Sequence, residues 1–88
     1  MYMYETINKE IGVLSYSFSG GNTKRFFPRK IEVEGRELDL LETGIRMLVK
    51  KGQNFIQIFM MSDGNNQYRL SFEPENRLWT MLGRKAQA

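Results

Sequence analysis

Cysteine and histidine are both missing from this sequence of 88 residues. Without cysteine the chain has no thiol nucleophile, no disulfide and no thiolate ligand for an iron–sulfur cluster. Without histidine it has no imidazole base, no Ser-His-Asp triad and no imidazole ligand for zinc. Because the commonest catalytic and metal-binding groups are absent, we expect a non-enzymatic protein with no cofactor and no metal site.

Motifs for phosphate binding and acid–base catalysis are also lacking. Gly20 and Gly21 are followed by neither the Lys-Ser/Thr ending of a P-loop nor the glycine spacing of a dinucleotide-binding turn. Glu32 and Glu34 share one face of a predicted strand, but their alternation with apolar residues points them to solvent. The turn around Gly64 lacks most ligands of a calcium loop. The sequence therefore predicts no catalytic residue.

Long apolar runs are absent too. The longest, residues 55–61, is interrupted by Gln57 and is far shorter than the ~20 residues that cross a bilayer. Residues 1–5 lack the basic start and apolar run of a secretory signal. Absence of cysteine is typical of proteins in a reducing compartment. These features predict a cytoplasmic protein with no membrane partner.

The length suits a single domain over residues 1–88, in which we expect 1–9 and 83–88 to be poorly ordered tails. Hydrophobic residues make up 41% of the chain and aromatic residues 12%, which is typical of a folded domain. A domain of this size buries little more than ~60% of its unfolded surface. Since neither a disulfide nor a metal supports so small a core, association with another chain is the expected support.

Alternating apolar and polar residues predict strands along most of the chain. Residues 11–19 and 30–34 show this period of two, and residues 54–61 are apolar on both sides of the pleat. The next strands are predicted at 67–73 and 78–82. Turn-forming residues separate the last three strands, so we expect an antiparallel meander in the C-terminal half.

Residues 39–51 fit two structures. Asp39 followed by Glu42 resembles a capping box, and two lysines before Gly52 suit the end of a helix. The rival is a strand, because Ile45, Met47 and Val49 alternate with other residues, and Gly44 weakens a helix. We favour the helix, which predicts an α+β fold with a small antiparallel sheet. The alternative is an all-β roll or open barrel.

One segment combines cations with aromatic rings in the way that single-stranded nucleic-acid sites do. Cations follow phosphates, and rings stack on bases. The candidate residues for binding a nucleic acid or another anionic partner are Lys24, Arg25, Phe26, Phe27, Arg29 and Lys30. The alternative is that the two rings turn inward and the cations are simply solvated.

Charge alternates along the chain in blocks. Residues 20–31 carry a net charge of +4, residues 32–42 carry −4 and residues 43–52 carry +3. Blocks of opposite sign favour association between surfaces, including two copies of one chain. Our first hypothesis is a small binding module that engages a protein partner or itself. The second is a module that binds single-stranded nucleic acid through residues 24–30.

Overall fold

Strands make up all the regular structure described in this protein. The computed structural model describes residues 4–19, 25–41 and 44–86, and over those residues it contains eight strands and no helix. No described segment is therefore a helix that could span a membrane. The strands are β1 (Glu5–Glu10), β2 (Gly12–Ser19), β3 (Arg25–Val33), β4 (Arg36–Asp39), β5 (Gly44–Lys51), β6 (Asn54–Ser62), β7 (Asn66–Glu73) and β8 (Leu78–Ala86).

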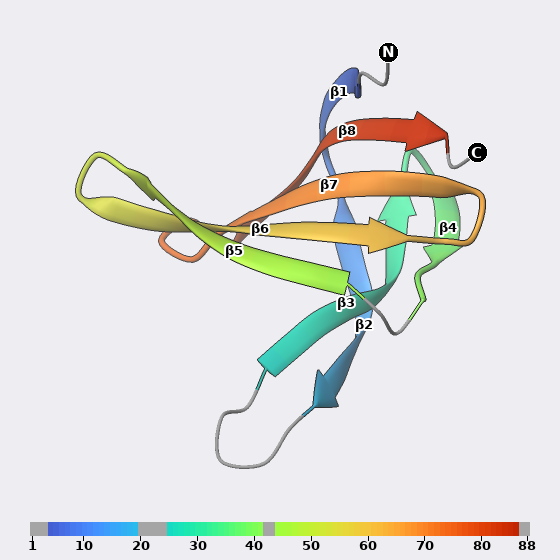
Figure 1. Cartoon of the computed structure of the whole chain (residues 1–88), viewed down its shortest axis with the longest axis horizontal. Coiled ribbons are helices and arrows are strands. Elements are labelled where there is room, and N and C mark those ends of the chain that lie inside the picture. The colour runs from blue at the N-terminus through green and yellow to red at the C-terminus, as the bar shows by residue number, and fades with distance from the viewer. Residues whose placement is uncertain (1–3, 20–24, 42–43, 87–88) are drawn as a thin grey trace.

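The strands form two antiparallel sheets, and the chain passes between them twice, from β1 to β2 and from β4 to β5. The larger sheet has the order β1-β8-β7-β6-β5, and the smaller has the order β2-β3-β4. β1 runs into β2 through Ile11, whose N–H donates to the carbonyl oxygen of Trp79 at 3.0 Å. In Figure 1 the smaller sheet runs steeply across the direction of β6 and β7.

Side chains from both sheets meet in one core. Phe59, Leu70 and Met81 are cross-strand neighbours on β6, β7 and β8, and all three are buried. Direct neighbours share a face of the sheet, so the period of two in each strand produces one apolar surface. Ile31 from the smaller sheet and Leu40 from the segment after β4 are also buried. Each such side chain contributes about 1.5–3 kcal/mol through burial.

The predicted helix at 39–51 is wrong, and with it the α+β fold. Gly44–Lys51 form β5, in which every residue pairs with a residue of β6. The lysines before Gly52 end a strand and not a helix, because Gly52 has a φ of +63° and begins the two-residue turn into β6. Asp39 caps nothing and instead pairs with Lys30 across β3 and β4. The all-β alternative agrees with the observed strands.

Gly44 shows why the strand prevails at this point. A Cβ atom added there would lie 3.2 Å from the carbonyl oxygen of Met60 and would collide with the Met61 side chain. The start of β5 therefore approaches β6 more closely than a larger residue allows. Ile45 and Leu48, which are three residues apart and would share one face of a helix, are largely exposed. A helix at this position has no core face against which to pack.

The meander predicted for the C-terminal half is confirmed as β6, β7 and β8, each antiparallel to the next. The terminal segments also contribute strands. Glu5–Glu10 form β1, and β8 extends to Ala86. The two strands pair with each other, and Arg84 donates to the Glu5 carboxylate at 2.9 Å. β1 therefore completes one edge of the larger sheet, and β5 forms the other.

Candidate functional site

The structure does not gather the predicted basic-aromatic segment into an open platform. The rings of Phe26 and Phe27 are partly buried, and each lies 5.9 Å from the ring of Phe59. Lys30 forms an ion pair with Asp39 at 3.8 Å, and Arg29 is partly buried. Arg25 begins β3, while Lys24 lies outside the described residues. Base stacking requires exposed ring faces, so this geometry does not favour the nucleic-acid hypothesis.

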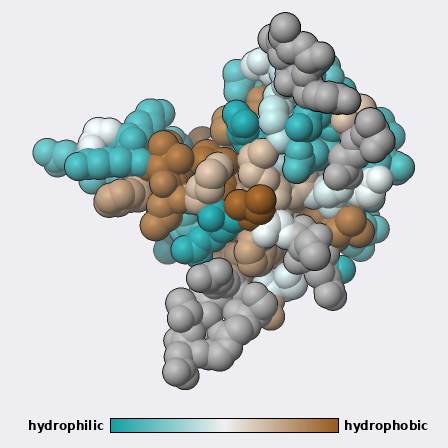
Figure 2. Space-filling view, viewed as in Figure 1, coloured by the Kyte–Doolittle hydropathy of each residue, from teal (hydrophilic) through white to brown (hydrophobic). Residues whose placement is uncertain are grey.

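Exposed apolar side chains gather instead on the hairpin formed by β5 and β6. On the face that Figure 2 shows, a brown patch lies between the hydrophilic end of the hairpin and the rest of the molecule. Isolated exposed apolar residues are normal, but a contiguous group marks a docking surface. The exposed residues, with their exposed fractions, are Ile45 (62%), Met47 (44%), Leu48 (58%), Val49 (45%) and Phe55 (55%).

The hairpin carries apolar side chains on both of its faces. On the outer face, Ile45, Met47 and Val49 stand opposite three partly buried apolar residues of β6. On the inner face, Arg46 stands opposite the buried Phe59, and Leu48 stands opposite Gln57. Because residues 54–61 are apolar on both sides of the pleat, the sequence favours a strand that is covered on both faces. Figure 1 shows instead that the end of the hairpin projects from the molecule, where the larger sheet has no neighbour.

β5 also presents backbone groups that pair with no other described strand. In a two-residue hairpin, the residues that flank the turn exchange both backbone hydrogen bonds, and every second residue repeats this pattern. Lys51 and Asn54 flank the turn, so Val49, Met47 and Ile45 direct their N–H and C=O groups to β6. Their alternates, Arg46, Leu48 and Lys50, direct theirs away from the sheet. An edge of this kind is a template for another strand.

A groove of about 450 Å³ runs beside this edge. Phe27 of β3 forms one wall, and Gly44, Ile45, Arg46 and Leu48 of β5 form the other. β4 pairs with β3 only over residues 30–33, so it does not fill the space beside the first half of β3. The groove therefore lies between β3 and β5, with unpaired backbone groups along β5.

The charge of β5 has one sign. Arg46, Lys50 and Lys51 are cations, and β5 contains no acidic residue. Lys51 lies 3.9 Å from the carboxylate of Glu73. No carboxylate in the described part of the chain is within ion-pair distance of Arg46 or Lys50. These two cations are thus available to an acidic ligand that lies along the edge.

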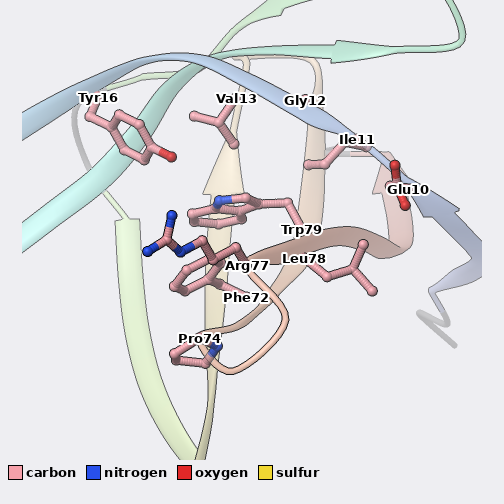
Figure 3. Close-up of a pocket in the computed structure, with 10 residues that line it drawn as sticks. All are labelled: Glu10, Ile11, Gly12, Val13, Tyr16, Phe72, Pro74, Arg77, Leu78 and Trp79. Carbon is pink, nitrogen blue, oxygen red and sulfur yellow. The ribbon is translucent and has the colours of Figure 1, made fainter.

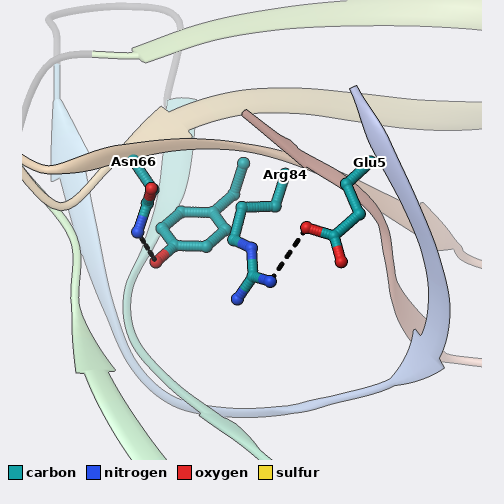
Figure 4. Close-up of polar contacts among 4 residues, drawn as sticks. Glu5, Asn66 and Arg84 are labelled. Carbon is teal, nitrogen blue, oxygen red and sulfur yellow. Dashed lines mark hydrogen bonds and ion pairs between the residues drawn. The ribbon is translucent and has the colours of Figure 1, made fainter. Parts of the chain in front are cut away.

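Two other grooves are lined by side chains that contact one another. The one in Figure 3 is lined by Tyr16, Phe72 and Trp79, and the ring centroids of Phe72 and Trp79 are stacked 4.8 Å apart. The second, of about 560 Å³, is polar. There the Lys9 ammonium pairs with Glu34, which lowers the pKa of that carboxyl group. Arg84 pairs with Glu5 in the same groove (Figure 4).

A carboxylate at the side of this polar groove organises the β6–β7 turn. Asp63 Oδ1 accepts the backbone N–H groups of Asn65 and Asn66, each at 2.8 Å, and its Oδ2 accepts the Tyr68 hydroxyl at 2.8 Å. Partial burial raises the pKa of Asp63, but the hydrogen bonds from Asn66, Asn65 and Tyr68 outweigh it and hold the pKa below its ordinary value of 3.8. The ionised form of Asp63 is therefore favoured in the folded state.

This arrangement predicts a pH dependence of folding stability. A carboxyl group whose pKa is lower in the folded state stabilises the fold above its unfolded pKa, and the effect is lost as the pH falls through the folded pKa. Between about pH 6 and pH 3 the wild type should lose more unfolding free energy than Asp63→Asn, by less than about 1 kcal/mol because the carboxylate is partly solvated. Urea denaturation at both pH values measures the difference. Equal losses in the two proteins would contradict the role assigned to Asp63.

Comparisons of the chain with protein-family models, with curated proteins and with solved structures found no significant match.

Proposed function

We propose that this protein is a non-enzymatic binding module that captures an extended polypeptide segment along the free edge of β5. One observation carries the proposal: an apolar edge strand has unpaired backbone groups and lies beside an open groove. In binding by strand addition, main-chain hydrogen bonds supply affinity and alternate side chains supply specificity. The absence of histidine and cysteine from the sequence is consistent with a module that binds without catalysing a reaction.

The exposed side chains support strand addition over a flat docking surface. Native edge strands are usually short, covered or rich in charge, since an open edge invites aggregation. β5 has eight residues, and four exposed apolar side chains lie on it. Arg46 and the paired lysines at its end limit uncontrolled pairing, but the centre of the strand is unprotected. An edge kept open in this way is what a strand-binding site requires.

The test places a proline at a position where it removes a hydrogen bond only from an added strand. Leu48 directs its N–H away from β6, so Leu48→Pro removes a donor from the open edge and leaves the hydrogen bonds of the hairpin in place. Leu48→Thr is the matched control, because it shortens the side chain but keeps the N–H group. The binding partners are ten-residue peptides selected from a random displayed library against the wild-type protein.

We expect Leu48→Pro to weaken binding of the selected peptides about tenfold or more, and Leu48→Thr to weaken it only a few-fold. Fluorescence anisotropy with labelled peptides measures the dissociation constants. Far-ultraviolet circular dichroism and urea denaturation verify that both variants remain folded. If the selected peptides bind Leu48→Pro as tightly as the wild type, or if the library yields no binder, strand addition at β5 is wrong.

A further inference from the structure

We infer that the strand captured by β5 is an acidic segment of another protein, with two carboxylates four residues apart on one face, and not a second copy of this chain. The inference rests on the proposed strand addition and specifies the partner. It is drawn from the charges on β5, from the face of the sheet to which each of its side chains points, and from the position of the groove.

The four-residue spacing follows from the geometry of a strand. Arg46, Leu48 and Lys50 are alternate residues, so they share one face of β5, and Arg46 and Leu48 also line the groove. In a neighbouring strand, the residue opposite each of them points to the same face of the sheet. The residues opposite Arg46 and Lys50 are therefore four positions apart, with an apolar residue opposite Leu48 between them. This spacing is the same for a parallel and an antiparallel partner.

Electrostatic complementarity selects carboxylates at those two positions. Opposite charges in direct cross-strand pairs stabilise a sheet, and like charges destabilise it. Arg46 is partly buried at the side of the groove, where a ligand would displace water from it. On the outer face, Ile45, Met47 and Val49 favour apolar or β-branched neighbours. The segment that fits therefore does not alternate strictly between polar and apolar residues. It carries two acidic residues with apolar residues around them.

A second copy of β5 does not meet these requirements. Two copies of β5 related by a twofold axis would pair antiparallel. Residues that stand opposite each other would then point their side chains to the same face of the sheet. Centred on Leu48, this pairing sets Arg46 of each copy against Lys50 of the other. Centred on Met47, it sets Lys50 against Gly44. In neither register does a cation of one strand stand opposite a carboxylate of the other, because β5 contains no acidic residue.

The acidic strand β4 of a second copy does not fit either. β4 is also an edge strand, but it has only four residues. Its carboxylates, Glu37 and Asp39, are two positions apart and cannot oppose both Arg46 and Lys50. The acidic and basic blocks of this chain therefore do not complement each other as one strand pair.

The experiment compares two capped peptides of identical composition. The fitting peptide, Thr-Val-Glu-Val-Leu-Thr-Glu-Ile-Thr, places its carboxylates four residues apart. The control, Thr-Val-Glu-Val-Leu-Glu-Thr-Ile-Thr, places them three apart, so that one carboxylate points to the outer face. A third peptide replaces both glutamates of the fitting peptide with lysine. Titration of ¹⁵N-labelled protein, followed through the amides of β5, measures each dissociation constant.

We expect the fitting peptide to bind about two- to fivefold more tightly than the control, and tenfold or more above the lysine peptide. In the double variant Arg46→Gln/Lys50→Gln, the two glutamate peptides should bind alike. Sedimentation equilibrium of the protein alone at about 100 μM should show a monomer. If the control or the lysine peptide binds as tightly as the fitting one, or if a dimer forms that Leu48→Pro abolishes, the acidic-partner inference is overturned while strand addition stands.

Failure of the proposed function itself gives a different result. If neither the designed peptides nor the peptides selected from the library bind in a manner sensitive to Leu48→Pro, then strand addition is wrong and the inference falls with it. If selected peptides bind but none of the designed peptides does, only the acidic-partner inference is wrong.

Discussion

Replacing Phe59 with alanine is expected to destabilise the protein by about 3–5 kcal/mol, the usual cost of removing a large buried aromatic ring. Phe59 is fully buried. Its ring lies 5.2 Å from that of Trp79 and 5.9 Å from those of Phe26 and Phe27. It therefore joins β3 to β6 and β8. A small domain has about 5–15 kcal/mol of stability in all, so this variant should lose a large share of its unfolding free energy.

Phe55→Ala provides the matched control for this prediction. Phe55 lies on the same strand and the same face as Phe59, but it is more than half exposed. Its replacement should cost about 1 kcal/mol or less, because most of its surface is already in water. Urea denaturation followed through fluorescence of Trp79, the one tryptophan, measures both variants. Equal stabilities of Phe59→Ala and Phe55→Ala would contradict the position of Phe59 at the centre of the core.

The second large effect is expected at Leu40, between β4 and β5. Leu40 is buried, and its N–H donates to the carbonyl oxygen of Arg29 at 2.6 Å. Leu41 is exposed, although its N–H donates to the carbonyl oxygen of Ser62 at 2.7 Å. Both backbone bonds survive substitution by alanine, so the two variants differ only in the apolar surface that each loses.

We expect Leu40→Ala to cost about 2–5 kcal/mol and Leu41→Ala to cost less than about 1 kcal/mol. Thermal unfolding monitored by circular dichroism should show a much lower midpoint for Leu40→Ala than for its neighbour. Similar midpoints for the two variants would mean that the segment between β4 and β5 does not close the core. The comparison is sharp because residue type, backbone bonding and chain position are nearly the same.

Local pattern was sufficient to predict the part of the fold that local contacts form. β6, β7 and β8 are consecutive strands with short turns, and their period of two is visible in the sequence. The error at 39–51 has the opposite origin. Lysines before a glycine end a helix and a hairpin strand equally well, and what decides between them here is pairing with β6. The alternation of Ile45, Met47 and Val49 was the better signal.

The candidate site could not be predicted from local pattern, because it depends on the order of the strands. Nothing within the sequence of β5 indicates that it lies at an edge, and the same residues in the middle of a sheet would be core. Likewise, the segment around Phe26 and Phe27 has the composition of a site on which nucleic-acid bases stack. The direction of the two rings is set by Phe59, more than thirty residues further along the chain.

The pairing of β1 with β8 has a consequence for synthesis of the chain. Glu5 of β1 stands opposite Arg84 of β8, so β1 can pair only after β8 has left the ribosome. β2, β3 and β4 can pair early, because their partners are close in sequence. The larger sheet is complete only after β8 has been synthesised. Until then the apolar strands of the larger sheet stay exposed to other nascent chains, so we expect the yield of folded protein to depend on how quickly β8 is released.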